Sequence, residues 1–188
     1  MENALIVSST NKSSSIFTEI LRITNIKIKN VSSAGEARRL FLEQFFDLVI
    51  VDAPLSDESG ESFSRYIASK SLSQVILAVG NEHFNTVSAV CEPDGVLTIS
   101  KPVNIEVFWY ALSLAKSASY KIKRFQEENA KLKQKIEDIR LIDRAKCLLI
   151  SYVKLSEQEA HRFIEKQAMD LRSSKRAIAE EIIKTYEN

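Results

Sequence analysis

Five short runs of apolar and β-branched residues, separated by segments with the spacing of amphipathic helices, occupy the first 118 residues of the chain. The runs lie at residues 4–7, 26–31, 47–51, 75–79 and 96–99, and the helical segments at 16–21, 35–45, 60–70, 83–92 and 104–118. Strands that are apolar on both faces and alternate with helices are typical of a parallel sheet that helices cover on both sides. The pattern therefore predicts an α/β, doubly wound domain at residues 1–118.

The composition is that of a soluble chain with one or two compact domains. Its 188 residues are 45% hydrophobic and 27% charged. The sequence has no apolar run long enough to cross a membrane, and the N-terminus lacks the basic flank and long apolar stretch of a secretory signal. We therefore expect a cytoplasmic protein without a membrane partner. Residues 117–188 carry 16 Lys/Arg against 12 Asp/Glu, a modest positive charge that permits a nucleic-acid partner.

Residue types that carry catalysis or bind metals are sparse. Only Cys91, Cys147, His83 and His161 could contribute to a zinc site, and their spacing matches no such site. The four glycines form no phosphate-binding loop, and no nucleophile stands in a catalytic context. The sequence therefore predicts a protein that is not an enzyme and that has neither a metal site nor a cofactor.

The third apolar run ends in an acidic residue with distinctive neighbours. Residues 47–52 read Asp-Leu-Val-Ile-Val-Asp and are followed by Ala-Pro-Leu-Ser-Asp-Glu-Ser-Gly, while Lys101-Pro102 follows the fifth run. These segments resemble the phosphoacceptor and lysine segments of response-regulator receiver domains, which have a flavodoxin-like sheet. The resemblance implies that Asp52 occupies the phosphoacceptor position at the carboxyl edge of the sheet, together with Lys101.

Other positions of the receiver machinery differ from the family pattern. Ser8 and Ser9 stand where receivers have the acidic pair that holds Mg²⁺, Val79 where they have a switch hydroxyl, and Thr98 where an aromatic residue is usual. Two neutral hydroxyls cannot supply the charge that a hard cation requires. Asp52 is therefore either a working phosphorylation site with reduced accessory residues or a strand-end acid, paired with the lysine, in a pseudo-receiver. We expect the pseudo-receiver.

Residues 119–143 carry a stripe whose positions recur at alternating steps of three and four. The positions are Ile122, Phe125, Asn129, Leu132, Ile136, Ile139 and Asp143. This spacing predicts a coiled-coil linker, in which a polar residue such as Asn129 fixes the register and favours two strands. We expect a homodimer with parallel helices. A monomer in which the stripe packs on its own receiver is the alternative.

Residues 144–188 predict a module of three helices, the first of which continues the linker to about residue 153. Ser156 and Glu159 have the spacing of a capping box at the start of the second helix. Ser174 can cap the third helix, without a capping-box partner.

The apolar faces of the second and third helices form the expected core of this module. They comprise Ala160, Phe163, Ile164 and Ala168, then Ile178, Ala179, Ile182, Ile183 and Tyr186. We expect both faces to pack against Leu148, Leu149 and Tyr152 of the first helix.

The order and spacing of residues in these helices resemble those of the ANTAR module, a three-helix RNA-binding domain of transcription antitermination regulators. The resemblance covers roughly residues 135–187 and rests on Ala145-Lys146, Leu148-Leu149, residues 155–160, Ala168-Met169-Asp170 and Arg172. Cys147 departs from the usual Gly, and His161 from a common aromatic residue. The family implies that each module of a dimer binds the loop of one of two paired RNA hairpins.

Exposed cations are the candidate contacts with the phosphates of such loops. They are Arg144, Lys146, Arg172, Lys175 and Arg176. The sequence as a whole therefore predicts a response-regulator-like antiterminator that binds paired hairpins in nascent mRNA as a dimer. The alternative is a protein-interaction adaptor that docks a sensor or inhibitor protein on its receiver face and binds no RNA.

Overall fold

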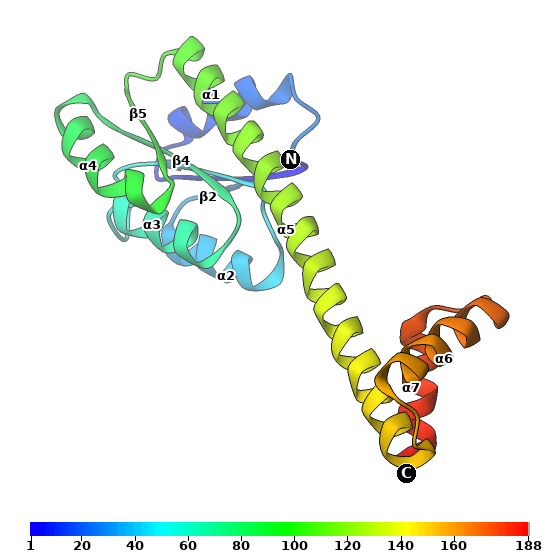
Figure 1. Ribbon diagram of the computed structural model, residues 1–188. Helices are drawn as coiled ribbons and strands as arrows, with labels where there is room; N and C mark the ends of the chain where they lie inside the picture. Colours follow the sequence, from blue (N-terminus) through cyan, green and yellow to red (C-terminus); the bar gives the residue numbers. More distant parts are fainter. Residues whose placement is uncertain (188) are drawn as a thin grey trace. The chain divides into compact units, whose positions relative to one another are not determined.

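The computed structural model describes residues 1–187, and the side chains of residues 1–10 and 16–187. The elements are, in chain order, β1 (Asn3–Ser8), α1 (Asn11–Arg22), β2 (Lys27–Val31), α2 (Ala34–Glu43), β3 (Leu48–Asp52), α3 (Gly60–Lys70), β4 (Gln74–Gly80), η1 (Asn81–His83), α4 (Phe84–Cys91), η2 (Glu92–Asp94), β5 (Leu97–Lys101), α5 (Ile105–Leu148), the π-helical turn η3 (Leu149–Val153), α6 (Glu157–Asp170) and α7 (Lys175–Tyr186) (Figure 1). Every strand and helix expected from the sequence is present.

The five strands form one parallel sheet in the order β2-β1-β3-β4-β5. This is the strand order of the flavodoxin-like, doubly wound class, in which ligands bind at the carboxyl ends of the strands. The predicted fold class is therefore confirmed. The register places Ser8, the last residue of β1, opposite Asp52, the last residue of β3.

The sheet has a separate hydrophobic core on each face, because successive strand residues point to opposite sides. Helices α1 and α5 cover one face, where Ile6 packs in one cluster with Phe17 and Phe108. Helices α2, α3 and α4 cover the other, where Val7 packs with Phe63 (Figure 1). All five side chains are at most 1% exposed. Burial of each large apolar side chain stabilises the fold by roughly 1.5–3 kcal/mol.

Helix α5 belongs to two compact units, which divide after Arg124. The N-terminal unit runs past the predicted boundary at residue 118. Ser119 is buried, and the ammonium of Lys123 lies 3.2 Å from Oδ1 of the buried Asp47. Among residues 1–187, no helix is both long enough and apolar enough to span a bilayer.

The C-terminal unit packs α6 and α7 against the end of α5. Its buried core comprises Ala145, Leu149, Ala160, Ile164, Ala168, Ile178, Ala179 and Ile182. The Ser156–Glu159 capping box is present as predicted, and Ser174 accepts a hydrogen bond from the backbone N–H of Ala177.

Two aromatic residues that were expected in this core are exposed. Phe163 is 41% exposed and Tyr152 is 62% exposed. The ring of Tyr152 instead stacks on that of Tyr186, with 5.3 Å between the ring centroids. The prediction was wrong at both residues. Helical spacing gives the side of the helix on which a residue lies but not how far the neighbouring helix covers it.

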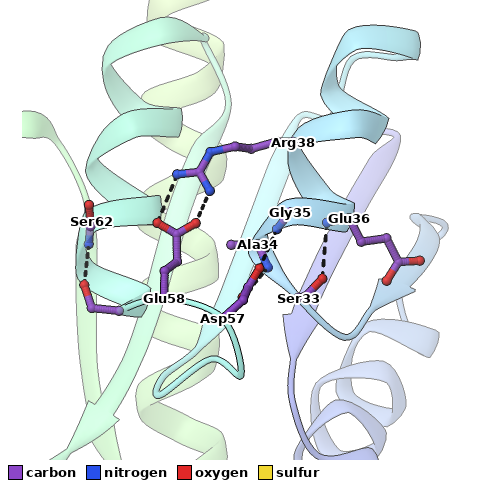
Figure 2. Close-up of polar contacts among 9 residues, drawn as sticks. Ser33, Ala34, Gly35, Glu36, Arg38, Asp57, Glu58 and Ser62 are labelled. Carbon is purple, nitrogen blue, oxygen red and sulfur yellow. Dashed lines mark hydrogen bonds and ion pairs between the residues drawn. The ribbon is translucent and has the colours of Figure 1, made fainter.

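The loop that follows β3 is tied to the start of α2 (Figure 2). The backbone N–H groups of Ala34 and Gly35 donate to the carboxylate of Asp57 at 3.0 and 2.8 Å. These two hydrogen bonds lower the pKa of Asp57 below its ordinary value. The next residue, Glu58, pairs with both terminal nitrogens of Arg38 on α2. The loop that begins beside Asp52 is thus held by α2 through two consecutive carboxylates.

Asp57→Ala should lower the free energy of unfolding of the N-terminal unit by about 1 kcal/mol at neutral pH, because α2 loses a capping carboxylate. The folded-state pKa of Asp57 lies below its unfolded value of about 4, so this contribution is complete above about pH 4. It is lost as the pH falls through the folded-state pKa. The parent and the variant should therefore converge in strongly acidic solution.

Denaturant unfolding followed by the fluorescence of Trp109 measures this difference. Trp109 is the only tryptophan of the chain and packs against the sheet of the N-terminal unit. Glu43→Ala, which removes an exposed carboxylate from the last residue of α2, is the matched control. Equal losses of stability in the two variants would contradict the capping role of Asp57.

Candidate functional site: the Asp52 edge of the sheet and the C-terminal helices

The Asp52 carboxylate is buried at the carboxyl edge of the sheet and contacts two side chains. The hydroxyl of Ser8 donates to Oδ2 at 2.8 Å. The ammonium of Lys101 lies 2.5 Å from Oδ1 as an ion pair and also donates to the backbone carbonyl of Ala53. Asp52 is 4% exposed, so water screens this pair weakly. The structure therefore brings together the two residues that the sequence placed at the phosphoacceptor position.

The side chains around Asp52 do not fit a divalent cation. Ser8 and Ser9 offer neutral hydroxyls, and the Ser9 hydroxyl donates to the carbonyl of Pro54 at 3.1 Å. Among the described residues, no three His, Cys, Asp or Glu side chains are placed to hold a metal ion. Mg²⁺ binds through carboxylates and other strongly polar oxygens, and Asp52 is the one carboxylate in this group. A receiver-type magnesium site is therefore incomplete in this chain.

The two switch positions are also altered in the structure. Val79 is 4% exposed and packs in the core between the sheet and helices α2 to α4. It offers no hydroxyl at the end of β4. Thr98 lies on β5, and its buried hydroxyl has no hydrogen-bond partner in the described part of the chain. Thr98 likewise offers no aromatic ring at the second switch position.

Four of the five candidate RNA-binding cations are held by carboxylates within the C-terminal unit. Lys146 pairs with Asp143 at 2.8 Å and with Glu157 at 3.3 Å, contacts that raise its pKa. Lys175 pairs with Glu165 at 2.5 Å and lowers the pKa of that carboxyl. Lys146 and Lys175 thus both contact α6, on the side that carries Glu157 and Glu165.

The two candidate arginines that pair with carboxylates lie between α5 and the C-terminal helix. Arg144 pairs with Glu187, and Arg176 lies 2.8 Å from both Asp138 and Glu180. These contacts stabilise the packing of α7 on α5. They also mean that the two side chains are not open to a phosphate without a rearrangement.

Arg172 differs from the other four cations. It is exposed, and no ion pair of its guanidinium is found within residues 1–187. Its backbone is left-handed, with φ of 48°. Lys154, in the turn before α6, is left-handed as well, with φ of 63°. Two cations therefore stand at the turns on either side of α6.

The predicted coiled-coil stripe is largely open to solvent in a single chain. Phe125, Leu132, Ile136 and Ile139 are 51–58% exposed, and Ile122 is half-buried. Four large apolar side chains on one stripe of a helix form a surface that a second helix can cover.

Asn129 lies within this stripe and bonds to its own helix. Its side-chain amide donates to the backbone carbonyl of Phe125 at 3.0 Å. The amide oxygen and the second amide hydrogen remain available to a partner helix.

Comparison with known proteins matches both halves of the chain to described families. The family model of the response regulator receiver domain matches residues 4–113, and that of the ANTAR domain matches residues 130–183. The transcriptional regulatory protein PdtaR of Mycobacterium tuberculosis is 28% identical over 139 residues, which are 74% of this chain and 68% of that protein.

Solved structures agree on the fold of the N-terminal unit. The signal receiver domain of an HD domain-containing protein from Pseudomonas fluorescens has a TM-score of 0.58 at 19% identity, over 65% of this chain and 92% of that one. A response regulator receiver domain protein from Clostridium thermocellum has a TM-score of 0.57 at 21% identity, over 66% and 99%.

Proposed function

Because the chain belongs to the response regulators, with a receiver domain followed by an ANTAR domain, we propose that it is a transcription antiterminator that binds paired hairpins in nascent mRNA as a homodimer. The match of residues 130–183 to the ANTAR domain carries this proposal. Binding of the paired hairpins would hold the transcript in a form that excludes the terminator stem. The protein would act in the cytoplasm, where the transcript emerges.

Phosphate binding by the C-terminal unit proceeds through exchange of ion-pair partners. Lys146 and Lys175 are neutralised by Glu157 and Glu165, so an RNA phosphate has to replace a carboxylate at each ammonium. The Glu157 and Glu165 carboxylates are open to water, although the Lys146 side chain is only 16% exposed. Ion pairs that water reaches contribute little to stability, so the exchange is energetically accessible. Arg172 has no carboxylate partner among the described residues, so it can bind a phosphate without breaking an ion pair.

The receiver unit acts in this proposal as a pseudo-receiver. The contacts of Asp52 with Ser8 and Lys101 occupy the position at which a phosphoryl group would form. A receiver has three carboxylates at this position, the acidic pair and the phosphoacceptor. This site has only Asp52 and therefore lacks the charge to bind Mg²⁺. The input would then come from a sensor or inhibitor protein that contacts the receiver face.

Dimerisation supplies two RNA-binding modules in one particle. The stripe of Ile122, Phe125, Leu132, Ile136 and Ile139 would form the seam of a parallel coiled coil. Two linked modules bind two hairpins with higher avidity than either module alone, because the second binding event is intramolecular.

Addition of Mg²⁺ or of beryllium fluoride with Mg²⁺ should leave the fluorescence of Trp109 and the backbone NMR spectrum of the receiver unit unchanged, because the carboxylates needed to bind the cation are missing. The control is addition of the same ions to a receiver with a complete acidic pair. A saturable response that disappears in Asp52→Asn would contradict the pseudo-receiver assignment.

The double variant Leu132→Asp, Ile136→Asp should sediment as a monomer, because each substitution places a charge in an apolar seam. Lys131→Asp, Gln134→Asp changes residues off the stripe and should leave the dimer intact. If the seam variant stays dimeric in sedimentation equilibrium, the two chains associate through another surface.

Lys146→Ala and Arg172→Ala should each weaken binding of a two-hairpin RNA by roughly 1–3 kcal/mol, the range for hydrogen bonds to charged groups. Binding should also depend less steeply on salt in both variants, since fewer counterions are released. Lys131→Ala, on the coiled-coil segment, is the matched control. Fluorescence anisotropy over a range of salt concentrations measures both quantities.

The melting curve of Arg172→Ala should stay close to that of the parent, because an exposed cation contributes little to folding. That of Lys146→Ala should shift modestly, because the Lys146 side chain is only 16% exposed and its apolar stem is covered. A folded double variant that binds RNA as tightly as the parent would refute the site assignment. A parent chain that binds no hairpin RNA would favour the adaptor function instead.

A further inference from the structure

A cavity of about 270 Å³ lies between α6 and α7. Its lining includes the buried apolar residues Leu149, Ile178 and Ile182, which are at most 8% exposed. Phe163 of α6 and Tyr186 of α7 contribute aromatic rings. The cavity lies apart from Lys146 and Lys175, which contact the other side of α6.

The aromatic rings of this cavity are only partly covered by the protein. Phe163 is 41% exposed although it lies beside the core, and Tyr186 is half-buried. Tyr186 stacks on Tyr152 with an angle of 27° between the ring planes, which fixes the orientation of its ring. Two partly exposed aromatic rings in the lining of one cavity are suited to a flat ligand.

Three polar residues share the lining with these rings. Gln167 of α6 has a side-chain amide with no hydrogen-bond partner in the described chain, and the carboxylate of Glu181 on α7 has no ion-pair or hydrogen-bond partner there. The Thr185 hydroxyl donates to the backbone carbonyl of Glu181 at 2.9 Å and can still accept a hydrogen bond. The cavity therefore offers one amide that both donates and accepts, one hydroxyl that accepts and one carboxylate that accepts.

We propose that this cavity, which we call the α6–α7 pocket, binds one unpaired base from the loop of the RNA hairpin. This inference rests on the RNA-binding function proposed above and names a base-recognising site within it. Unpaired bases are recognised by stacking on aromatic side chains together with hydrogen bonds to their edges. Phe163 and Tyr186 supply the stacking surfaces, and Gln167 and Glu181 the hydrogen bonds.

The chemistry of the pocket also restricts the base. An ionised carboxylate accepts hydrogen bonds and donates none. Adenine, cytosine and guanine each carry an amino group that can donate to Glu181. The edge of uracil has a single N3–H donor between two carbonyl oxygens, and these oxygens would repel the carboxylate. The pocket therefore favours an amino-bearing base over uracil.

An apolar side chain from a protein partner fits the same pocket less well. An apolar side chain would bury the unpaired amide of Gln167 and the carboxylate of Glu181 without giving either a partner. A buried polar group without a partner is destabilising, and more so when it is charged. The lining therefore favours a ligand that is both flat and rich in hydrogen-bonding groups.

The probe for this site is a two-hairpin RNA selected for binding to the full-length chain from a pool with randomised loops. With that RNA, Gln167→Ala and Phe163→Leu should each weaken binding by roughly tenfold, as expected for loss of base contacts. The salt dependence should stay that of the parent, since no phosphate contact is removed. Gln126→Ala, at an exposed glutamine on α5, is the matched control and should have no effect. Melting curves establish that each variant is folded.

Removal of loop bases one at a time tests whether the pocket binds one particular base. At one loop position an abasic nucleotide should weaken binding of the parent by a similar factor, and Gln167→Ala should then add no further loss. Uracil at that position should bind as weakly as the abasic RNA. Glu181→Gln should restore binding of the uracil-containing RNA, because an amide can donate to a carbonyl.

The outcomes separate this inference from the function on which it rests. If the pool yields no RNA whose binding weakens with salt, the proposed function and the pocket assignment both fall. If selected RNAs bind but folded Gln167→Ala and Phe163→Leu bind them like the parent, the RNA-binding function stands and the pocket assignment is wrong. If Gln167→Ala and the abasic nucleotide weaken binding additively at every loop position, the assignment is also wrong.

Discussion

Helix α5 runs over 44 consecutive residues and packs against different parts of the chain along its length. Both compact units depend on this one helix. Near its start, Phe108 and Leu112 are buried under the sheet. Near its end, Ala145 packs into the core made with α6 and α7. Between these parts the helix contains no glycine or proline and leaves a stripe of large apolar side chains exposed. Most of the stability of a helix in a protein comes from packing of its apolar face, and α5 has such packing at both ends.

The residues around Asp52 differ from the receiver pattern in how they contact the carboxylate. In a receiver, the phosphoacceptor carboxylate lies beside other carboxylates that repel it. A bound metal ion neutralises this repulsion and holds the carboxylates together. Here a hydroxyl and an ammonium satisfy the same carboxylate directly. The fold around it, from the strand register to the loop clamp at Asp57, stays that of a receiver. In the proposed pseudo-receiver, the receiver fold is thus kept while the chemistry of this edge differs.

Periodicity accounts for most of what could be predicted from the sequence. The apolar runs predicted the strands, and the spacing of Ser156 and Glu159 predicted the N-terminal cap of α6, because both patterns are local in the sequence. The clamp between Asp57 and α2 and the pairing of Lys146 with Glu157 could not be predicted, because they join residues that meet only after folding. The exposure of Phe163 was missed for the same reason. Candidate cations can be identified by charge, but their partners depend on tertiary proximity.

The left-handed backbone at Lys154 and Arg172 has a consequence for redesign of this unit. For residues with a Cβ this conformation is unfavourable by roughly 1–2 kcal/mol, and glycine would adopt it without strain. Glycine at both turns would give a more stable module with two fewer positive charges. Consensus or stability design applied to this domain would therefore tend to select against its basic character. The chain has a lysine and an arginine where the backbone favours glycine, so these two positive charges come at a cost in thermal stability.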